Sequence, residues 1–454
     1  MNRLRFNTLG QITEIESTKS ITSIELLSQS QKKAALLHRQ GIGPGQRVAL
    51  SHGTSIEFFI DLLATWMTGA CAVPLDSRLP DLALRNIIAE ANIDLILPGN
   101  DFFSSTLPLL NRDPREALIL FTSGISGAPK GVVHSWTSVE AKFSALANAI
   151  PLTDIQKTLC MLPLHFGHGL LANSLFPLLH GAHLYIGKPF HDETILSLGE
   201  IIDLHQISFL SSVPAIWKYI LQFSASGPLE ASLRRVHCAS EPLPKKIWHQ
   251  AREWSRSQQF KNVYGLTETA SWIAGPDDDQ ANEAEGFIGK PWGAEFRTCE
   301  LGLLHVKTNS LMLGYWQNHQ LNATAIDGEW FNTGDQASID SAGNISLRGR
   351  KQNVINCSGI KVFPEELELF LTSAPGVSDI AVVPLDHKIS GQEIAAAVVF
   401  ASSDAQMSCS RLEEWCRERL PPHQVPRRWL ALENLPRTNR GKLDRRKIIG
   451  LLGG

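Results

Sequence analysis

One stretch decides the fold, and it reads Ala117-Leu118-Ile119-Leu120-Phe121-Thr122-Ser123-Gly124-Ile125-Ser126-Gly127-Ala128-Pro129-Lys130-Gly131. The apolar run from Ala117 to Phe121 predicts a buried strand, and a loop rich in glycine and hydroxyl side chains follows it. Glycine lets the backbone approach a ligand closely, and a lysine adds a point charge with three donors. Such a loop suits the oxygens of a polyphosphate. A surface turn between a strand and a helix is the alternative. Because Gly131 follows the lysine, the spacing differs from that of P-loop nucleotidases.

Composition narrows the class of protein. The chain has 454 residues, which predicts two or three domains, and a net charge of −3, which argues against a protein that mainly contacts nucleic-acid backbone. We expect no signal peptide and no membrane span, because no apolar segment of about 18 residues occurs. The seven cysteines form no CxxC pair, so neither a zinc site nor a disulfide framework is indicated. These features favour a cytoplasmic protein.

The order of expected elements predicts an α/β fold. From residue 23 to about 264, helices of 10 to 18 residues alternate with short apolar strands, which indicates parallel βαβ units. A single helix is expected over 192–205. From about Gly286, short segments between Gly, Asn and Asp turns predict antiparallel hairpins in a small β-rich subdomain. Residues 350–358 read as an irregular linker, and a small α+β domain follows it.

Further motifs occur in order along the chain: Tyr264-Gly265-Leu266-Thr267-Glu268, Gly314-Tyr315-Trp316, Trp330-Phe331-Asn332-Thr333-Gly334-Asp335, Gly349-Arg350-Lys351-Gln352 and Leu435-Pro436-Arg437-Thr438-Asn439-Arg440-Gly441-Lys442. With the loop at 122–131, this set resembles the superfamily of adenylate-forming enzymes, which includes acyl- and aryl-CoA synthetases, the adenylation domains of peptide synthetases, and luciferase. The resemblance runs from about residue 23 to the carboxyl terminus.

The resemblance implies a fold and a two-step reaction. Residues 1–349 would form an adenylation domain that binds ATP and the carboxylic acid, and residues 350–454 a mobile domain with its hinge near Gln352, where the family usually has Asp or Lys. A carboxylate would attack the α-phosphate of ATP, and a thiol would then displace AMP. The implied cofactors and partners are ATP, Mg²⁺, a small carboxylic acid, and CoA or the phosphopantetheine of a separate acyl carrier protein.

The same resemblance implies roles for individual residues. Lys442, Glu268, Thr267 and Lys130 would be catalytic, with Glu268 as the ligand of Mg²⁺, whose preferred ligands are hard oxygens. Around the nucleotide we expect Thr122, Ser123, Gly124, Ser126, Gly127, Lys130, Ser240, Glu241, Pro242, Tyr264, Gly265, Thr267, Asp335, Arg350 and Lys442. Among these, Tyr264 would lie against adenine, while Asp335 and Arg350 would bind the ribose. Ser358 and Gly359 would line the thiol channel.

The acid-binding pocket is expected around His165, Phe166, His168 and Gly265. The family usually has an aromatic residue followed by histidine in this loop, and here the order is reversed. Relatives that activate α-amino acids place an Asp in the loop, whereas no carboxylate lies between Leu162 and Gly181. An α-amino acid is therefore disfavoured.

Three functions remain open from the sequence: a CoA ligase, a stand-alone ligase that loads a carrier protein, and a non-catalytic nucleotide-binding relative. The third predicts decay of the catalytic residues, and these are present. Either a monomer or a homodimer fits the composition. One departure lies in the first loop, because Ile125 stands where the family has a hydroxyl residue, and this predicts weaker ATP binding that Ile125→Thr would restore in part.

Overall fold

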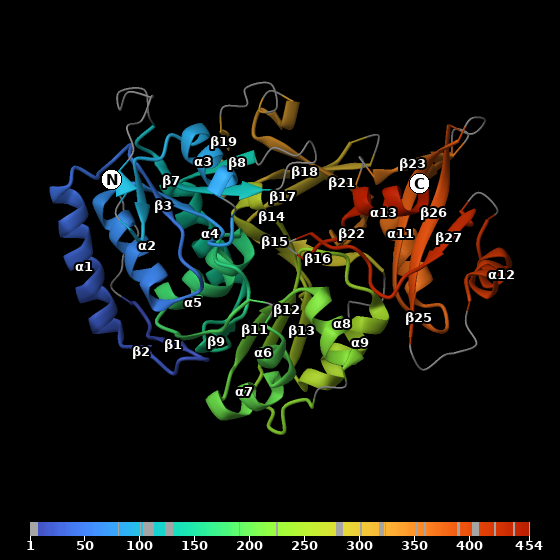
Figure 1. The fold of residues 1–454 in the computed structure, drawn as a ribbon, viewed down its shortest axis with the longest axis horizontal. Coiled ribbons are helices and arrows are strands. Elements are labelled where there is room, and N and C mark those ends of the chain that lie inside the picture. The colour runs from blue at the N-terminus through green and yellow to red at the C-terminus, as the bar shows by residue number, and fades with distance from the viewer. Residues whose placement is uncertain are drawn as a thin grey trace.

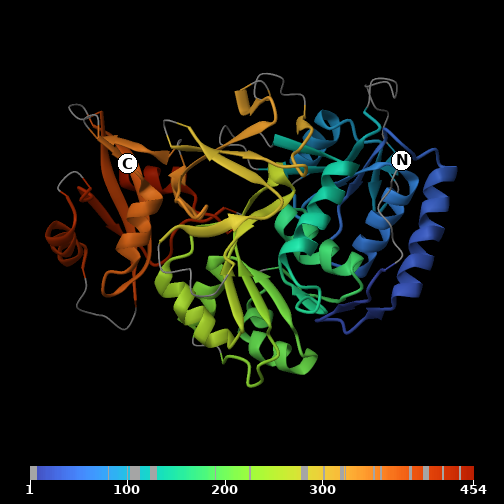
Figure 2. The ribbon, with the colours of Figure 1, turned by 180° about the vertical axis from the view of Figure 1, so that it is seen from behind.

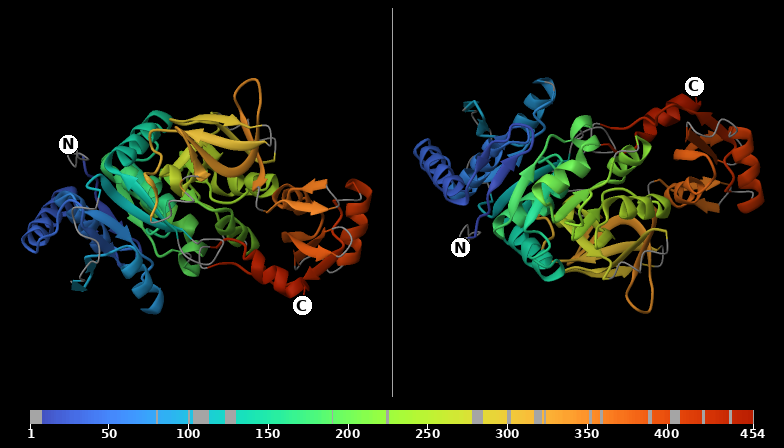
Figure 3. Two further views of the ribbon diagram at one scale, coloured as in Figure 1. Left: turned by 90° about the horizontal axis from the view of Figure 1, so that it is seen from above. Right: turned by 90° about the horizontal axis from the view of Figure 1, so that it is seen from below.

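A computed structural model describes residues 8–79, 81–99, 101–102, 113–122, 130–189, 191–223, 226–277, 285–299, 302–316, 322, 324–350, 353–357, 360–387, 391–401, 408–421, 424–438 and 441–453. The amino-terminal elements lie at one end of the molecule and the carboxyl-terminal elements form a lobe at the other end (Figures 1 and 3). The fold is α/β, as predicted.

The stretch that opened the sequence lies in a seven-stranded sheet. In spatial order, its strands are β19 (Gly314–Tyr315), β8 (Lys130–Ser135), β7 (Glu116–Thr122), β4 (Cys71–Pro74), β3 (Arg47–Leu50), β5 (Leu95–Leu97) and β6 (Asp101–Phe102). Strands β3, β4, β5 and β7 run parallel, as the βαβ pattern predicted. β8 returns antiparallel to β7, with Lys130 opposite Thr122. The alternative of a turn between a strand and a helix is therefore wrong, because the loop joins the two strands of a hairpin.

A second sheet continues the α/β part of the molecule. Its strands are, in order, β13 (Gln259–Asn262), β12 (Arg235–Cys238), β11 (Phe209–Ser212), β9 (Lys157–Cys160), β10 (His183–Ile186), β1 (Ile12–Glu14) and β2 (Ser20–Ile21). All neighbours pair in parallel except β1 with β2. In this sheet Ser211, His237 and Lys261 are direct cross-strand neighbours, so their side chains share one face.

Helices cover these two sheets (Figures 1 and 2). They are α1 (Ser23–Arg39), α2 (Ile56–Thr68), α3 (Asp81–Glu90), α4 (Trp136–Ala149), a π-helix (His168–Leu175), α5 (Phe176–Leu179), α6 (Asp192–Leu196), α7 (Leu198–His205), α8 (Pro214–Gln222) and α9 (Lys245–Ser255). Trp66 of α2 is buried and donates from Nε1 to the Ala117 carbonyl oxygen at 2.8 Å, which ties this helix to β7. Burial of such a large side chain contributes roughly 2–3 kcal/mol.

The helix expected over 192–205 is two helices instead. They meet at Ser197, which belongs to neither α6 nor α7. Its hydroxyl donates to the Glu193 carbonyl oxygen at 2.6 Å. A serine that bonds back to the preceding turn competes with the helical ladder, and this explains the break.

The predicted β-rich part is an antiparallel sheet. It contains β14 (Tyr264–Leu266), β15 (Ser271–Gly275), β16 (Phe287–Pro291), β22 (Ile345–Arg350), β21 (Trp330–Ile339), β18 (Leu303–Lys307), β17 (Glu295–Thr298) and, beside β21, β20 (Ile326–Asp327). A 3₁₀-turn, Thr267–Thr269, lies between β14 and β15.

The carboxyl-terminal lobe is the predicted α+β unit. Its sheet holds β24 (Ile360–Val362), β23 (Ile355–Cys357), β26 (Gly391–Phe400), β25 (Val377–His387) and β27 (Arg428–Ala431), and its helices are α11 (Pro364–Thr372), α12 (Cys409–Arg419) and α13 (Arg445–Gly453). The expectation of an irregular linker over 350–358 is wrong at β23, which pairs with β24. The predicted boundary after residue 349 falls next to the last residue of β22, Arg350. None of the helices described in these residue ranges is long and apolar enough to cross a membrane.

Candidate functional site

Part of the predicted site lies outside the described residues. Ser123, Gly124, Ile125, Ser126, Gly127, Gln352, Ser358 and Gly359 belong to that part, and of Thr122 only the backbone is described. The roles given to these residues stay predictions. Lys130 is described and begins β8, so the charged end of the loop is anchored in the first sheet.

The predicted ribose-binding residues converge on one buried carboxylate. Asp335 on β21 lies opposite Arg350 on β22, and the two form an ion pair with 2.9 Å between Arg350 Nε and Asp335 Oδ1. The Tyr264 hydroxyl donates to the other oxygen, Oδ2, at 2.6 Å. Burial, and then the negative charge of Asp335, raise the pKa of Tyr264 well above its usual value, so the phenol stays protonated. The protein thus orients both oxygens of the Asp335 side chain.

A second carboxylate, Glu268, is held by Tyr315, a residue that the sequence placed in a motif but to which it gave no role. The Tyr315 hydroxyl donates to Glu268 Oε1 at 2.7 Å. Burial and the negative charge of Glu268 raise the pKa of Tyr315, which therefore remains a donor. The Lys130 Nζ lies 5.7 Å from the centre of the Tyr315 ring, within the range of a cation–π contact. Lys130, Tyr315 and Glu268 therefore lie in one neighbourhood, although they come from three distant segments.

Two buried basic side chains, His134 and Lys142, donate to backbone carbonyl oxygens in and near the turn that carries Thr267 and Glu268. His134 on β8 contacts the Thr267 carbonyl oxygen through Nε2 at 2.8 Å. Burial lowers the pKa of His134 to about 4, so the ring is neutral and Nε2 carries the proton that it donates. Lys142 on α4 is fully buried and donates to the Trp272 carbonyl oxygen, just beyond the turn.

Glu268 also fits the demand of a magnesium ion. Mg²⁺ keeps several waters and takes one or two protein carboxylates, so a single oriented carboxylate beside a phosphate site is sufficient. In the ranges that the structure describes, no group of three or more His, Cys, Asp or Glu side chains forms a dedicated metal cage.

His168 links the predicted acid pocket to Ser240, Glu241 and Pro242, which are predicted to lie around the nucleotide and which we call the adenine turn. Its Nδ1 lies 3.0 Å from Ser240 Oγ, and its Nε2 lies 2.6 Å from Ser211 Oγ. Burial and the positive charge of Lys442 lower the pKa of His168 to about 3, so the ring is neutral. Ser240 has a φ of +77°, a left-handed conformation that favours glycine. The backbone of this turn is therefore bent as a glycine turn would be, although the residue is serine.

The remaining pocket residues fall in two places. His165 stacks edge-on against Phe166, with ring centres 4.1 Å apart, and its Nε2 lies 3.8 Å from Asp76 Oδ2. Gly265 pairs with Trp272, and a Cβ on Gly265 would lie 2.3 Å from the Ser271 carbonyl oxygen. The Trp272 ring in turn contacts His168 at 5.3 Å between centres. The structure thus groups Gly265 with His168, and His165 with Phe166.

Sequence reasoning missed an aromatic cluster behind His168. His237 is fully buried, and its ring contacts those of Trp272 at 4.7 Å and Trp292 at 5.7 Å. Neither His237 nitrogen has a hydrogen-bond partner among the described residues. The period-two pattern of β12 could have placed His237 on the face that it shares with Ser211. No pattern in the neighbouring sequence predicts that Trp272 and Trp292 pack against it.

Lys442 reaches this region from the carboxyl-terminal lobe. Its backbone closes a tight turn, in which the Thr438 amide donates to the Lys442 carbonyl oxygen at 2.7 Å. The charge of Lys442 lowers the pKa of His168, as noted, and opposes the rise that burial causes in the pKa of Glu241. The predicted catalytic lysine therefore lies within electrostatic range of the acid pocket and the adenine turn.

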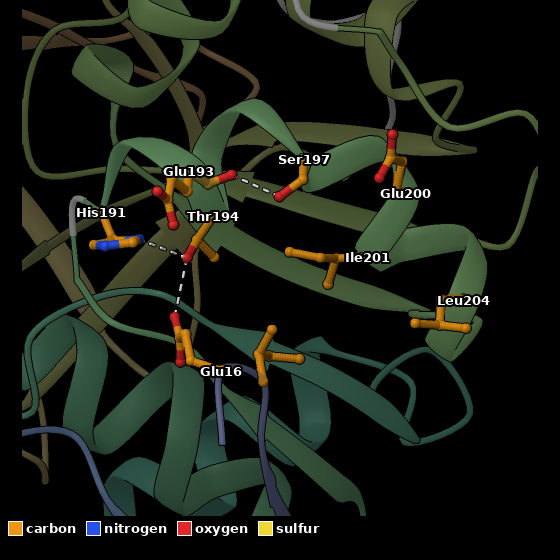
Figure 4. Close-up of a pocket in the computed structure, with 9 residues that line it drawn as sticks. Glu16, His191, Glu193, Thr194, Ser197, Glu200, Ile201 and Leu204 are labelled. Carbon is orange, nitrogen blue, oxygen red and sulfur yellow. Dashed lines mark hydrogen bonds between the residues drawn. The ribbon is translucent and has the colours of Figure 1, made fainter. Parts of the chain in front are cut away.

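A separate pocket of about 470 Å³ lies between α6, α7 and the segment after β1 (Figure 4). Thr194 donates to Glu16 Oε1 at 2.9 Å across it. None of the predicted site residues lines this pocket.

Comparison with known proteins agrees with this geometry. Residues 8–113 and 108–316 match the family of AMP-binding enzymes, and residues 366–442 match the AMP-binding enzyme C-terminal domain. The chain belongs to the AMP-binding enzyme family. The resemblance to adenylate-forming enzymes that the motifs indicated is thereby confirmed.

Relatives of this AMP-binding enzyme include named ligases. A probable CoA ligase of Humulus lupulus is 27% identical over 89% of this chain and 79% of its own length. The 2-succinylbenzoate–CoA ligase of Bacillus licheniformis is 26% identical, over 97% of both chains. Among solved structures, the amide bond synthetase McbA from Marinactinospora thermotolerans superimposes with a TM-score of 0.86 at 25% identity, covering 98% of each chain.

Proposed function

We propose that this enzyme activates a small carboxylic acid with ATP, forming an acyl-adenylate, and then transfers the acyl group to the thiol of CoA. The observation that carries the proposal is that the first part of the chain holds two oriented carboxylates, Asp335 and Glu268. The charge of Lys442, a residue of the other lobe, lowers the pKa of His168, which supports a role for this lysine as well. The named CoA ligases among the relatives support the same reaction.

In the first step a carboxylate oxygen bonds to the α-phosphorus, and the bond from that phosphorus to the β-phosphate oxygen breaks. Catalysis of such a step consists mainly of positioning and charge neutralisation. Asp335 would accept the ribose hydroxyls, with Arg350 orienting its side chain. Lys442 would neutralise the charge that develops between the acid and the α-phosphate, and Lys130 the departing pyrophosphate.

We assign the Mg²⁺ ligand to Glu268. When bound, the ion would neutralise phosphate charge and orient the leaving pyrophosphate. The Tyr315 hydrogen bond fixes the carboxylate that would hold it. Thr267 would donate to the α-phosphate from the same turn.

The pocket favours an acid without an α-ammonium group. His168 is neutral, because burial lowers its pKa to about 3, and its neighbours Ser211 and Trp272 are uncharged. An ammonium group there would lose water without gaining a carboxylate, which is costly. Simple aliphatic and aryl acids meet no such penalty.

The acceptor in the second step is tested by supplying three kinds of nucleophile. The purified enzyme is first screened with ATP, Mg²⁺ and hydroxylamine against aliphatic, aryl and α-amino acids. The best acid is then given CoA, a holo-acyl carrier protein or a simple amine, and AMP release is measured. We expect CoA to accelerate AMP release most. Faster release with the carrier protein would move the assignment to a carrier-loading ligase, and with the amine to an amide-forming enzyme. No hydroxamate from any acid would contradict the proposal.

A further inference from the structure

Four charged side chains meet where the carboxyl-terminal lobe touches the rest of the molecule. They are Lys218 on α8, Glu241 in the adenine turn, Asp379 on β25 and Arg437 before the terminal turn, and we call them the interdomain ion cluster. The contact between Lys218 and Asp379 joins α8 to β25. The first two belong to the ATP-binding part of the molecule, and the last two belong to the lobe.

Asp379 is the centre of the cluster. Its Oδ1 accepts from the Lys218 ammonium and from the Ile380 amide, and its Oδ2 accepts from Arg437 Nη2 at 2.7 Å. The Arg437 guanidinium also lies 3.6 Å from Glu241 Oε2. Each cation therefore contacts Asp379, and the chain of contacts crosses between the two parts of the molecule twice.

The charges balance, and little water screens them. The four side chains expose only 16–25% of their surface, and they comprise two cations and two anions. Burial alone would raise the pKa of Asp379, but Lys218 and Arg437 outweigh it, so its pKa lies below the usual value and the carboxylate stays ionised. Losing one partner would leave a half-buried charge uncompensated, which costs more than losing an exposed pair.

The cluster also fixes the turn that carries Lys442. Arg437 Nη1 donates to the Gly441 carbonyl oxygen at 2.7 Å, and Gly441 precedes Lys442. The Gly441 amide donates back to the Thr438 carbonyl oxygen at 2.9 Å. Because Asp379 orients Arg437 and Arg437 orients the turn, a charge on β25 determines where the Lys442 backbone lies.

We propose that Asp379, through Lys218 and Arg437, is a positioning residue that holds the lobe where Lys442 serves the adenylation step. This inference rests on the proposed function of Lys442. The second step starts from an acyl-adenylate already formed, so it does not need an ammonium group between carboxylate and α-phosphate. Loss of the cluster should therefore slow the first half-reaction selectively.

The test uses the full-length enzyme and three variants. K218M keeps the apolar stem of the side chain and breaks the contact between the two parts, while it leaves the Asp379–Arg437 pair intact. D379N removes the central charge with nearly the same shape. R428M is the matched control, because Arg428 forms an ion pair of 2.8 Å with Glu393 wholly within the lobe.

Two readouts separate positioning from folding. Double electron–electron resonance measures the distance between two spin labels, placed at K246C on α9 and E414C on α12 in a C299S, C409S background. This distance reports the placement of the lobe with or without substrate. Acid-dependent ATP–pyrophosphate exchange reports adenylation, and AMP release from isolated acyl-adenylate with CoA reports thiol transfer. We expect a broadened distance distribution and about tenfold slower exchange in K218M and D379N, with thiol transfer within about twofold of the parent.

Exchange in the double variant K218M/D379N should be only slightly slower than in D379N. Both changes remove the same interaction, the one between Lys218 and Asp379, so their effects should not add. An unchanged distance distribution in K218M, or half-reactions slowed by the same factor, would contradict the inference. R428M should match the parent in both readouts. Failure of the proposed function would give a different result. Acid-dependent exchange would then survive the loss of Lys442, while K218M and D379N would still show the changed distance distribution.

Discussion

At the scale of single residues, the site depends on partners that lie far apart in the chain. The Asp335–Arg350 pair could be anticipated, because both residues lie in motifs and on neighbouring strands. Tyr315 could not be assigned a partner, because Glu268 lies 47 positions away and only the folded sheet brings them together. Local sequence thus identified the carboxylates and missed the hydroxyl that orients one of them.

Tyr315→Phe tests that hydroxyl. The change removes one hydrogen bond to a carboxylate and keeps the ring against Lys130. Such a bond is worth ~1–2 kcal/mol, so kcat/KM for ATP should fall about 5- to 30-fold. Steady-state kinetics at several Mg²⁺ concentrations measure it. Tyr185→Phe in the second sheet is the control, and equal kinetics for the two variants would remove Tyr315 from the site.

At the scale of elements, strand β14 approaches β15 so closely that position 265 has no space for a side chain. A Cβ at position 265 would lie 2.3 Å from the Ser271 carbonyl oxygen and 2.6 Å from the Trp272 Cα. Both are backbone atoms, so β14 and β15 would have to move apart. The period-two pattern predicted strands here, but the close approach depends on a β-bulge in the pairing between Tyr264 and Gly265.

Gly265→Ala should therefore lower both stability and adenylation. We expect acid-dependent pyrophosphate exchange to fall more than tenfold and the free energy of unfolding to drop by ~2 kcal/mol or more. Gly43→Ala serves as a control, because its nearest neighbouring atom is 3.9 Å away. Unaltered exchange in Gly265→Ala would show that the two strands separate without moving the site.

Helix α4 carries a buried cation beneath the same strand. Burial lowers the pKa of Lys142 from 10.5 to about 7. Between these two values the unfolded chain binds one more proton than the folded protein, so the free energy of unfolding rises with pH. Lys142 should contribute a rise of ~2–3 kcal/mol between pH 7 and pH 9.

Lys142→Met should flatten this rise, and it should stabilise the protein more at pH 7 than at pH 9. Urea unfolding at the two pH values measures both effects. If the variant kept the pH dependence of the parent, the buried amine would not be its source.

Parts of the fold followed from residue patterns, and others depended on tertiary packing. The parallel strands and most helices match their apolar periods. The break at Ser197 and strand β23 do not, because a side chain that bonds its own helix and a pairing between short strands leave no periodic signal. The sequence did not predict strand β8 either. Its six residues directly follow a glycine-rich loop, and the pattern there gives no separate strand signal.

At the scale of the whole molecule, the proposed function requires residues from both lobes. Asp335, Glu268 and Lys130 come from the ATP-binding part, whereas Lys442 comes from the carboxyl-terminal lobe, where it lies close enough to His168 and Glu241 to affect their pKa values. The family resemblance implied the same assignment of these residues to two domains. Lys218 and Asp379, which we propose to hold the lobe in place, lie outside every motif, and their contact emerges only from the structure.

The most direct test of the account is acid-dependent ATP–pyrophosphate exchange in the parent enzyme and in Lys442→Ala. The acid is the one that gives the strongest hydroxamate signal, and Lys447→Ala, an exposed lysine in the following helix, is the control. We predict exchange in the parent and in Lys447→Ala, and a loss of about 100-fold or more in Lys442→Ala, because a charge that neutralises the transition state is removed. Exchange at the parent rate in Lys442→Ala would contradict the central claim that the two lobes together activate a carboxylic acid.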